Sequence, residues 1–185
     1  MKVAPSAAGV GDAVIGSVFG VSEQTRAEFP VKATWNVSAP GYFRNGHTDT
    51  HLVSFSSDDP ESVQVTAVNK GPPGRQGSAS AQFVKVVSIE AAPAIVGMGS
   101  TPEFIVTTNP EGYERLVHIA YDPNTLGAQE VVATCGSSSA RCEVTVVGVK
   151  RIVCEEYNVV SETDDPGETE TVYAAWVNSP DKYWA

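Results

Sequence analysis

The sequence predicts an all-β protein made of tandem small β units, and three observations support this fold class. Val, Thr, Ser and Gly dominate the 185 residues, and short apolar runs alternate with polar residues between turn-forming Gly, Pro, Asn and Asp. No long stretch has the Leu, Ala, Glu and Lys mixture that is typical of helices. A hairpin-like segment near the C-terminal end also has a weaker copy upstream.

The repeated pattern consists of a strand, a small polar loop and a second strand. Residues 130–149 read EVVATCGSSSARCEVTVVGV, with a turn predicted at residues 136–140. The upstream segment VQVTAVNKGPPGRQGSASAQFVKVVSI has the same order. Aligning residues 77–81 with residues 136–140 places Val86 level with Thr145. This self-similarity predicts a tandem of related β units.

Composition and charge argue against nucleic acid and the membrane interior as partners of this chain. The chain is 42% hydrophobic, which is enough for a buried core, and its 22 acidic and 12 basic residues give a net charge of −10. No Lys/Arg cluster is available to neutralise phosphates, so we expect no nucleic-acid partner. No run approaches the roughly 18 apolar residues of a membrane span, so we expect no membrane insertion. Gly16 and Ser17 interrupt the first apolar run, which argues against a signal peptide there.

The first unit is predicted to cover residues 1–87. Residues 1–10 look like a poorly ordered lead-in, and residues 13–21 read as one strand. Apolar residues then alternate around Trp35, which is typical of a half-buried strand with a large core anchor. Further short strands follow at a spacing of roughly 8–12 residues, as expected of a β-sandwich. One of these strands, ESVQVTAV, is predicted to have Val63, Val65 and Ala67 pointing inward.

Two further units are predicted to follow without a Gly/Ser linker. Residues 88–148 form a second, shorter unit that is small for a sandwich and could lack a pair of edge strands. Residues 149–185 provide two or three strands, which cannot close a sandwich. We therefore interpret residues 149–185 as an incomplete third unit and the chain as a piece of a longer exported protein.

These patterns resemble a known family. The strands ATWNVSAPG, LVSFSSDDP and ESVQVTAV, followed by VTTNPEGYERLV and VVATCGSSSARCEVTVV, resemble bacterial immunoglobulin-like repeats of the broad polycystic-kidney-disease and bacterial Ig group. The chain departs from that group where WNVSAPG replaces a WDFGDG-like turn, and it has no cysteine pair spanning two sheets around Trp35. The resemblance implies tandem Ig-like β-sandwich units in a large secreted or surface protein, with no shared functional residue.

Two cysteines are candidates for a disulfide. Cys135 and Cys142 flank the predicted hairpin loop and could face each other across its strands. In an extracellular setting such a bond would contribute about 2–3 kcal/mol. The alternative is two small buried thiols in a reducing compartment. Cys154 is left over, and we expect it to be buried or paired with a residue outside this chain.

One stretch has metal-ligand chemistry. His47, Asp49 and His51 would share one face of a strand and could meet a zinc ion. Because a turn dipeptide, Asn45–Gly46, precedes them, we favour three polar residues on a solvated edge and predict no cofactor.

Acidic turns are the other candidate sites for a cation. One runs from Asp58 to Glu61, and another contains Asp164 and Asp165. Carboxylates in such turns suit calcium, but neither turn has a specific calcium-loop spacing, and solvated turns are the favoured interpretation.

No pattern predicts catalysis. The glycine-rich stretch 97–100 fits neither a nucleophile elbow nor a phosphate-binding loop, so we expect no enzyme. The favoured function is a structural or adhesive segment, acting as a stalk or spacer between neighbouring Ig-like domains, with cell-surface glycans or proteins as further partners. The alternative is a carbohydrate- or calcium-binding accessory module of an extracellular enzyme. Its exposed aromatic candidates are Tyr42, Phe43, Tyr113 and Tyr121.

Overall fold

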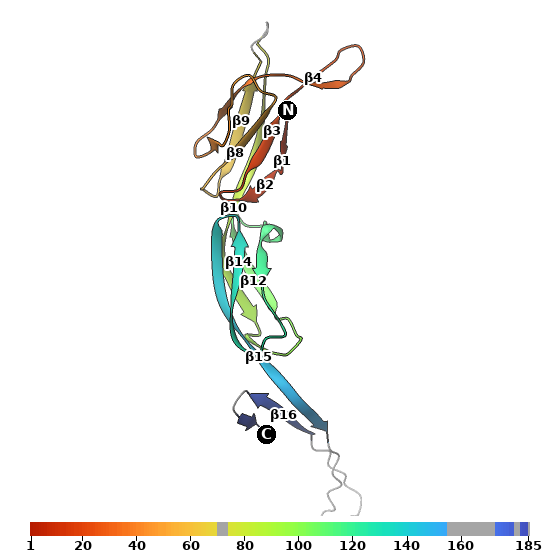
Figure 1. The fold of residues 1–185 in the computed structure, drawn as a ribbon, viewed down its shortest axis with the longest axis vertical. Helices are drawn as coiled ribbons and strands as arrows, with labels where there is room; N and C mark the ends of the chain where they lie inside the picture. The colour runs from red at the N-terminus through yellow and green to blue at the C-terminus, as the bar shows by residue number, and fades with distance from the viewer. Residues whose placement is uncertain (70–73, 155–172, 180–181, 185) are drawn as a thin grey trace, which may run out of the picture. The chain divides into compact units, whose positions relative to one another are not determined.

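The computed structural model describes the backbone of residues 1–69, 74–154, 173–179 and 182–184, and the side chains of residues 1–69 and 74–148. The described residues form β-strands and turns with one short 3-10 helix, Glu114–Leu116, which confirms the all-β prediction (Figure 1). The chain divides into two compact units. The first comprises Met1–Ile89, Val106–Ala120 and Val132–Arg141, and the second comprises Glu90–Ile105, Tyr121–Val131 and Cys142–Ala185. The predicted boundaries at residues 87 and 148 stay predictions.

Two sheets and a separate ribbon organise residues 1–89. The first sheet has the order β1-β3-β8-β7, from β1 (Lys2–Ala4), β3 (Val14–Ser17), β8 (Leu52–Ser56) and β7 (Tyr42–Phe43). The second joins β6 (Thr34–Val37), β9 (Ser62–Val68) and β10 (Gln76–Ala92), with β2 (Ala7–Gly9) parallel to β10. The ribbon pairs β4 (Phe19–Val21) with β5 (Glu28–Pro30).

The core of the first unit lies between these two sheets. The Trp35 side chain is fully buried, and its indole Nε1 donates a 3.0 Å hydrogen bond to the Thr50 carbonyl. Phe55 of β8 meets Phe83 of β10 edge-on, with ring centroids 6.2 Å apart. The predicted inward alternation along β9 is confirmed, because its apolar residues are 0–2% exposed: Val63, Val65 and Ala67. Period-two patterning therefore located this core correctly.

Two predictions for the N-terminal part of the chain were wrong. The lead-in is ordered, because β1 pairs with β3 and β2 pairs with β10. Residues 13–21 form two strands instead of one, since β3 belongs to the first sheet and β4 to the ribbon. Neither β1 nor β2 is longer than three residues, so periodicity alone could not identify them.

The remaining strands include the hairpin that the repeat pattern identified. They are β11 (Ile95–Gly97), β12 (Glu103–Asn109), β13 (His118–Ala120), β14 (Gly127–Cys135), β15 (Ser138–Cys154), β16 (Tyr173–Ser179) and β17 (Lys182–Trp184). One sheet has the order β13-β14-β15-β16-β17, and β11 runs parallel to β15. The strand β12 pairs with β10.

The hairpin turn between β14 and β15 is tighter than predicted. Only Gly136 and Ser137 separate the two strands, whereas seven residues, 69–75, separate β9 from β10. The predicted turn at residues 136–140 was therefore wrong. Loop similarity also gave a misplaced alignment of the two copies, because hydrogen bonds place Gln82, and not Val86, level with Thr145. The two copies share strand order but differ in the length of this turn.

We expect Trp35→Ala to lower the free energy of unfolding by about 3–5 kcal/mol, because it leaves a cavity in the core and removes the donor to the Thr50 carbonyl. The matched control is Ile15→Ala, since Ile15 is 51% exposed on the outer face of the first sheet, and its cost should stay within about 0.5 kcal/mol. Urea unfolding followed by tryptophan fluorescence for the control and circular dichroism for both variants measures the difference. Equal losses would contradict the assigned core.

Candidate functional site

Two short edge segments, residues 4–12 and residues 92–100, have the same backbone arrangement. Both carry the sequence Ala-Pro-x-x-x-Gly-x-Gly, and each contributes a three-residue strand that runs parallel to a 17-residue strand. In the first, β2 pairs with β10, and in the second, β11 pairs with β15. The sequence signal for this match is the recurrence of the eight-residue pattern, which the comparison of hairpin loops missed.

Four backbone hydrogen bonds recur in the two edge segments. Gln82 donates to Ser6 at 2.9 Å, Val10 to Val84 at 2.9 Å, Gly11 to Ser57 at 2.7 Å and Asp12 to Gly9 at 3.1 Å. Their counterparts are Thr145 to Ala94 at 2.8 Å, Met98 to Val147 at 2.9 Å, Gly99 to Pro123 at 2.8 Å and Ser100 to Gly97 at 2.9 Å. Gly11 and Gly99 both adopt the left-handed region, with φ of +80° and +82°. The two edge segments are therefore structural equivalents.

In the first compact unit, the tip of the β14–β15 hairpin packs on the edge segment. Val10 forms a parallel bridge with Gly136, and the Val10 carbonyl accepts hydrogen bonds from the Ser137 N–H at 2.8 Å and the Ser137 Oγ at 3.1 Å. The Val86 N–H donates to the Ser138 Oγ at 3.0 Å. This contact is made mainly by backbone atoms, which explains why side-chain patterns did not reveal it.

Glycines make this close approach sterically feasible. A Cβ added at Gly9 would overlap the backbone nitrogen of Gly136, and a Cβ added at Gly136 would overlap the Val10 carbonyl. Gly136 also adopts a φ of +59°, which side chains disfavour. Any other residue at these two positions would push the hairpin tip away from the edge segment.

The two cysteines do not form the predicted disulfide in this structure. Cys135 and Cys142 are both free, and the two-residue turn sets Cys135 beside Ser138, whose hydroxyl donates to the Cys135 carbonyl at 2.7 Å. Cys142 lies four residues further along β15, about 13 Å away at the usual rise of a strand. A disulfide needs Cα atoms within about 7 Å. The side chain of Cys154 lies outside the described residues.

The thiol environments differ between the two cysteines. Cys135 is buried, and its Sγ lies 3.4 Å from the Val84 carbonyl, whereas Cys142 is half-buried. Burial raises the pKa of the Cys135 thiol, and the negative charge of Asp12 raises this pKa further. Burial likewise raises the pKa of the Cys142 thiol. Both thiols are therefore poor nucleophiles at neutral pH.

The candidate residues His47, Asp49 and His51 are not assembled as a metal site. His47 stacks on Phe43 with ring centroids 4.8 Å apart, and Asp49 lies 3.6 Å from the Lys32 ammonium. Residues 48 and 49 form a bend and residue 47 is not in a strand, so they do not present one common face with His51. Within the described part of the chain, no group of three or more His, Cys, Asp or Glu residues could hold a metal ion.

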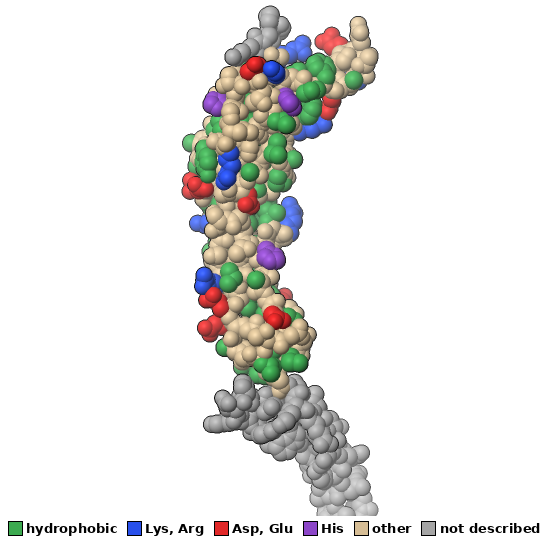
Figure 2. Space-filling model, in the orientation of Figure 1, with side chains coloured by type: hydrophobic (Ala, Val, Ile, Leu, Met, Phe, Trp, Pro, Cys, Tyr) green, Lys and Arg blue, Asp and Glu red, His purple; other side chains and the backbone are tan. Residues whose placement is uncertain are grey.

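Acidic side chains also lie apart from one another. On the face that Figure 2 shows, Asp and Glu occur in small groups instead of one patch. Asp122 accepts from the Thr125 hydroxyl at 2.6 Å and from the Asn124 N–H at 3.0 Å, and these bonds lower its pKa. Such bonds are those of a turn-forming carboxylate. The predicted turn with Asp164 and Asp165 lies outside the described residues.

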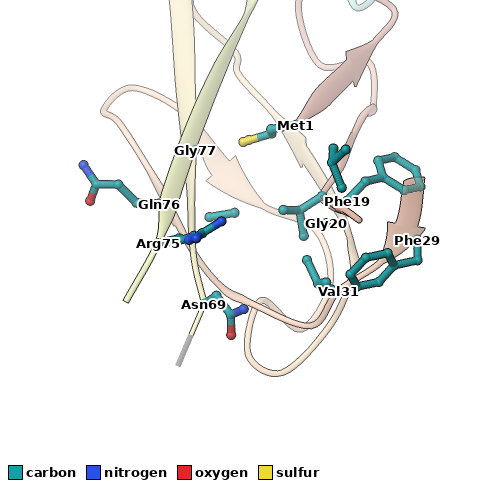
Figure 3. Close-up of a pocket in the computed structure, with 12 residues that line it drawn as sticks. Met1, Phe19, Gly20, Phe29, Val31, Asn69, Arg75, Gln76 and Gly77 are labelled. Atoms are coloured by element: carbon teal, nitrogen blue, oxygen red, sulfur yellow. The ribbon is translucent and has the colours of Figure 1, made fainter. Parts of the chain in front are cut away.

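The structure adds a cavity that the sequence did not predict. It has a volume of about 560 Å³ and lies between the β4–β5 ribbon and the ends of β9 and β10 (Figure 3). Phe19, Val21 and Phe29 provide apolar walls, while Asn69 and Arg75 provide polar ones. Val21 and Phe29 are about half exposed, at 53% and 49%. An apolar wall facing a guanidinium could accept an amphipathic ligand.

The four aromatic candidates for carbohydrate binding are engaged in local contacts. Tyr42 is 41% exposed and its hydroxyl lies 3.4 Å from an Asp58 carboxylate oxygen, while Phe43 is partly buried against the core. Tyr121 meets Phe104 edge-on. The remaining one, Tyr113, lies below the Arg115 guanidinium.

Comparisons with known proteins supply no family. No family model matches the chain, and no curated protein matches it. Among solved structures, one that matches is described as the structure of mouse clustered PcdhgC3 EC1-3, with 13% identity and a TM-score of 0.28. The match covers 78% of this chain and 65% of that chain, which is less than two thirds of its length. Among the described residues, no helix is long and apolar enough to cross a membrane.

We expect iodoacetamide to label Cys142 faster than Cys135 in the folded chain, because Cys135 is buried whereas Cys142 is half-buried. The raised pKa values of both thiols should keep both reactions slow at neutral pH. Labelling of both should accelerate as pH rises above the usual thiol pKa of about 8.5. The raised pKa values stabilise the fold below that pH, and this contribution is lost as pH rises through the folded-state values.

Trypsin cleavage after Arg141 separates the two cysteines, so peptide mass spectrometry measures each rate. Unfolding in urea is the control, and it should make the two rates similar. Resistance of both cysteines to labelling until a reductant is added would contradict the free thiols of this structure.

Proposed function

We propose that this chain is a non-catalytic structural and adhesive segment of a larger secreted or cell-surface protein of a bacterium, and that it acts as a stalk or spacer. The observation that carries the proposal is the recurrent parallel pairing of β2 with β10 and of β11 with β15. Its partners would be neighbouring Ig-like domains of the same polypeptide, together with glycans or proteins at the cell surface.

A spacer has to transmit tension between its ends, and the parallel pairing suits this task. In the first copy of this parallel arrangement, formed by β2 and β10, the chain enters through β1 and β2 and leaves through β10. Tension therefore pulls two parallel neighbouring strands in opposite directions along their length. The force then acts on all hydrogen bonds between the two strands at once, in shear. In a hairpin pulled at its two open ends, by contrast, the hydrogen bonds break one at a time. The second copy repeats this geometry with β11 and β15.

Continuity of the strands supports the same proposal. The strands β10 and β15 each comprise 17 residues. No Gly/Ser linker separates the copies in the sequence. A chain that carries load through backbone bonds needs no reactive side chain.

We expect Val10→Pro to lower the force at which the first copy unfolds, because proline removes the N–H that donates to the Val84 carbonyl. Atomic-force pulling of the full chain between its ends measures this force. Trp35→Ala is the control, since it removes core packing but no bond between β2 and β10. The unfolding force should fall further in Val10→Pro even though Trp35→Ala loses more equilibrium stability. The reverse order would argue against tension bearing by β2.

The accessory-module alternative is favoured only by the cavity beside the β4–β5 ribbon. Under the spacer proposal, we expect the full chain to stay in the unbound fraction when it is mixed with insoluble cellulose, chitin or peptidoglycan. Retention that Phe29→Ala abolishes and Ile15→Ala preserves would favour the accessory module. Both side chains are about half exposed, at 49% and 51%, so the two variants are matched in surface loss.

A further inference from the structure

The second edge segment exposes the face that the first one buries. Val10 is 4% exposed in the first segment, whereas its equivalent Met98 is 56% exposed. Ala7 is 9% exposed, whereas its equivalent Ile95 is 62% exposed. Val10 also belongs to the core cluster of the first unit, so core packing contributes to its burial, whereas Ala7 is not in that cluster and its contrast with Ile95 concerns the outer face.

The inward pair shows that both strands are packed alike on their own sheets. Ala8 is 7% exposed and its equivalent Val96 is 8% exposed. The strand β2 is buried along all three residues, while β11 is buried only at its central residue. The first segment therefore has a cover on its outer face that the second does not have among the described residues.

The cover in the first segment includes the hairpin tip of Gly136 and Ser137. Its serine donates both its N–H and its hydroxyl to the Val10 carbonyl. The tip also fills the space beside Gly11, where an added Cβ would lie 3.1 Å from the Ser137 Oγ. At the equivalent Gly99, an added Cβ meets no atom of the described residues within 4 Å.

A glycine is retained at the position where the tip requires one. Gly9 has to be glycine because Gly136 approaches its Cα directly. Its equivalent is Gly97, at the end of β11. Glycine inside a strand costs stability and often marks close approach of another backbone. Gly97 therefore fits an incoming hairpin tip of the same kind.

We propose that the outer face of residues 95–99 is a docking site for the glycine-serine tip of a β-hairpin from a further copy of this repeat. The incoming tip would bridge to Met98 as Gly136 bridges to Val10, and it would donate to the Met98 carbonyl. It would also cover the apolar side chains of Ile95 and Met98. This inference rests on the proposed function, since it identifies the partner of a spacer as a copy of the repeat itself.

The occupant is defined by the chemistry of the first segment. The bridge between Val10 and Gly136 and the bond from the Ser137 N–H to the Val10 carbonyl are backbone contacts. They need a donor, an acceptor and a glycine at set positions. The second segment offers the same backbone geometry through its four matching hydrogen bonds. A general apolar partner would need no such match.

The test extends the full chain by inserting a second copy of residues 90–148 after Gly148. The tip serine of the inserted copy should then have a protected amide, exchanging at least about 100-fold more slowly than a free amide, and we expect the same protection of Ser137 in the same molecule. Gly97→Val in the original copy should release only the inserted tip, and Gly46→Val is the matched control because a Cβ at Gly46 meets nothing within 4 Å. Free exchange at the inserted tip, beside protected strands in the inserted copy, would overturn the proposal.

A second measurement covers failure of the inserted copy to fold. A backbone-cyclised peptide of residues 130–143 is titrated into the unmodified chain, and amide shifts are followed by nuclear magnetic resonance. Shifts should appear at Met98, Gly99 and Val147, and a peptide with Ser137→Pro, which lacks both donors, should cause none. Absence of shifts at millimolar peptide would overturn the proposal. The pulling experiment on β2 and β10 is independent of this outcome, so failure here is distinguishable from failure of the spacer.

Discussion

The parallel pairing of a three-residue edge strand with a long final strand is the constraint on which this structure depends. In the first copy, β2 closes one side of the second sheet while β1, only two residues earlier, belongs to the first sheet. The chain therefore crosses between the two sheets at its start and holds them together around Trp35 and Phe83. A small β-sandwich buries little apolar surface, so its core contributes limited stability. A segment that pairs with both sheets also reduces the number of unpaired strand edges.

Glycine is what lets backbone meet backbone at this edge. Gly9 and Gly136 approach so closely that neither tolerates a Cβ, and Gly11 needs a left-handed conformation to turn the chain toward Asp12. The resulting contacts are hydrogen bonds between main-chain atoms, with few side chains involved. Under the proposed function, main-chain hydrogen bonds of the kind that define the fold would also bear tension and bind the hairpin tip of a further repeat.

In the described residues, the side chains that could do chemistry are held in local structural contacts. The carboxylate of Asp122 organises its own turn, His47 stacks on Phe43, and the buried Cys135 thiol has a raised pKa. Each of these groups has a structural partner close by. The cavity beside Phe19 and Phe29 is the place where side chains of mixed character gather, and it lies on a ribbon outside both sheets of the first unit.

The all-β class, the buried alternation of Val63 and Val65, and the role of Trp35 were determined by sequence alone, because period-two patterning directly records which side chains leave water. The ordering of residues 2–9, the two-residue turn at Gly136 and the separation of Cys135 from Cys142 were decided only by tertiary structure. The physical reason is that these features depend on main-chain hydrogen bonds between distant segments. Such bonds use N–H and C=O groups that nearly every residue has, so they leave little trace in side-chain identity beyond a glycine where two backbones meet.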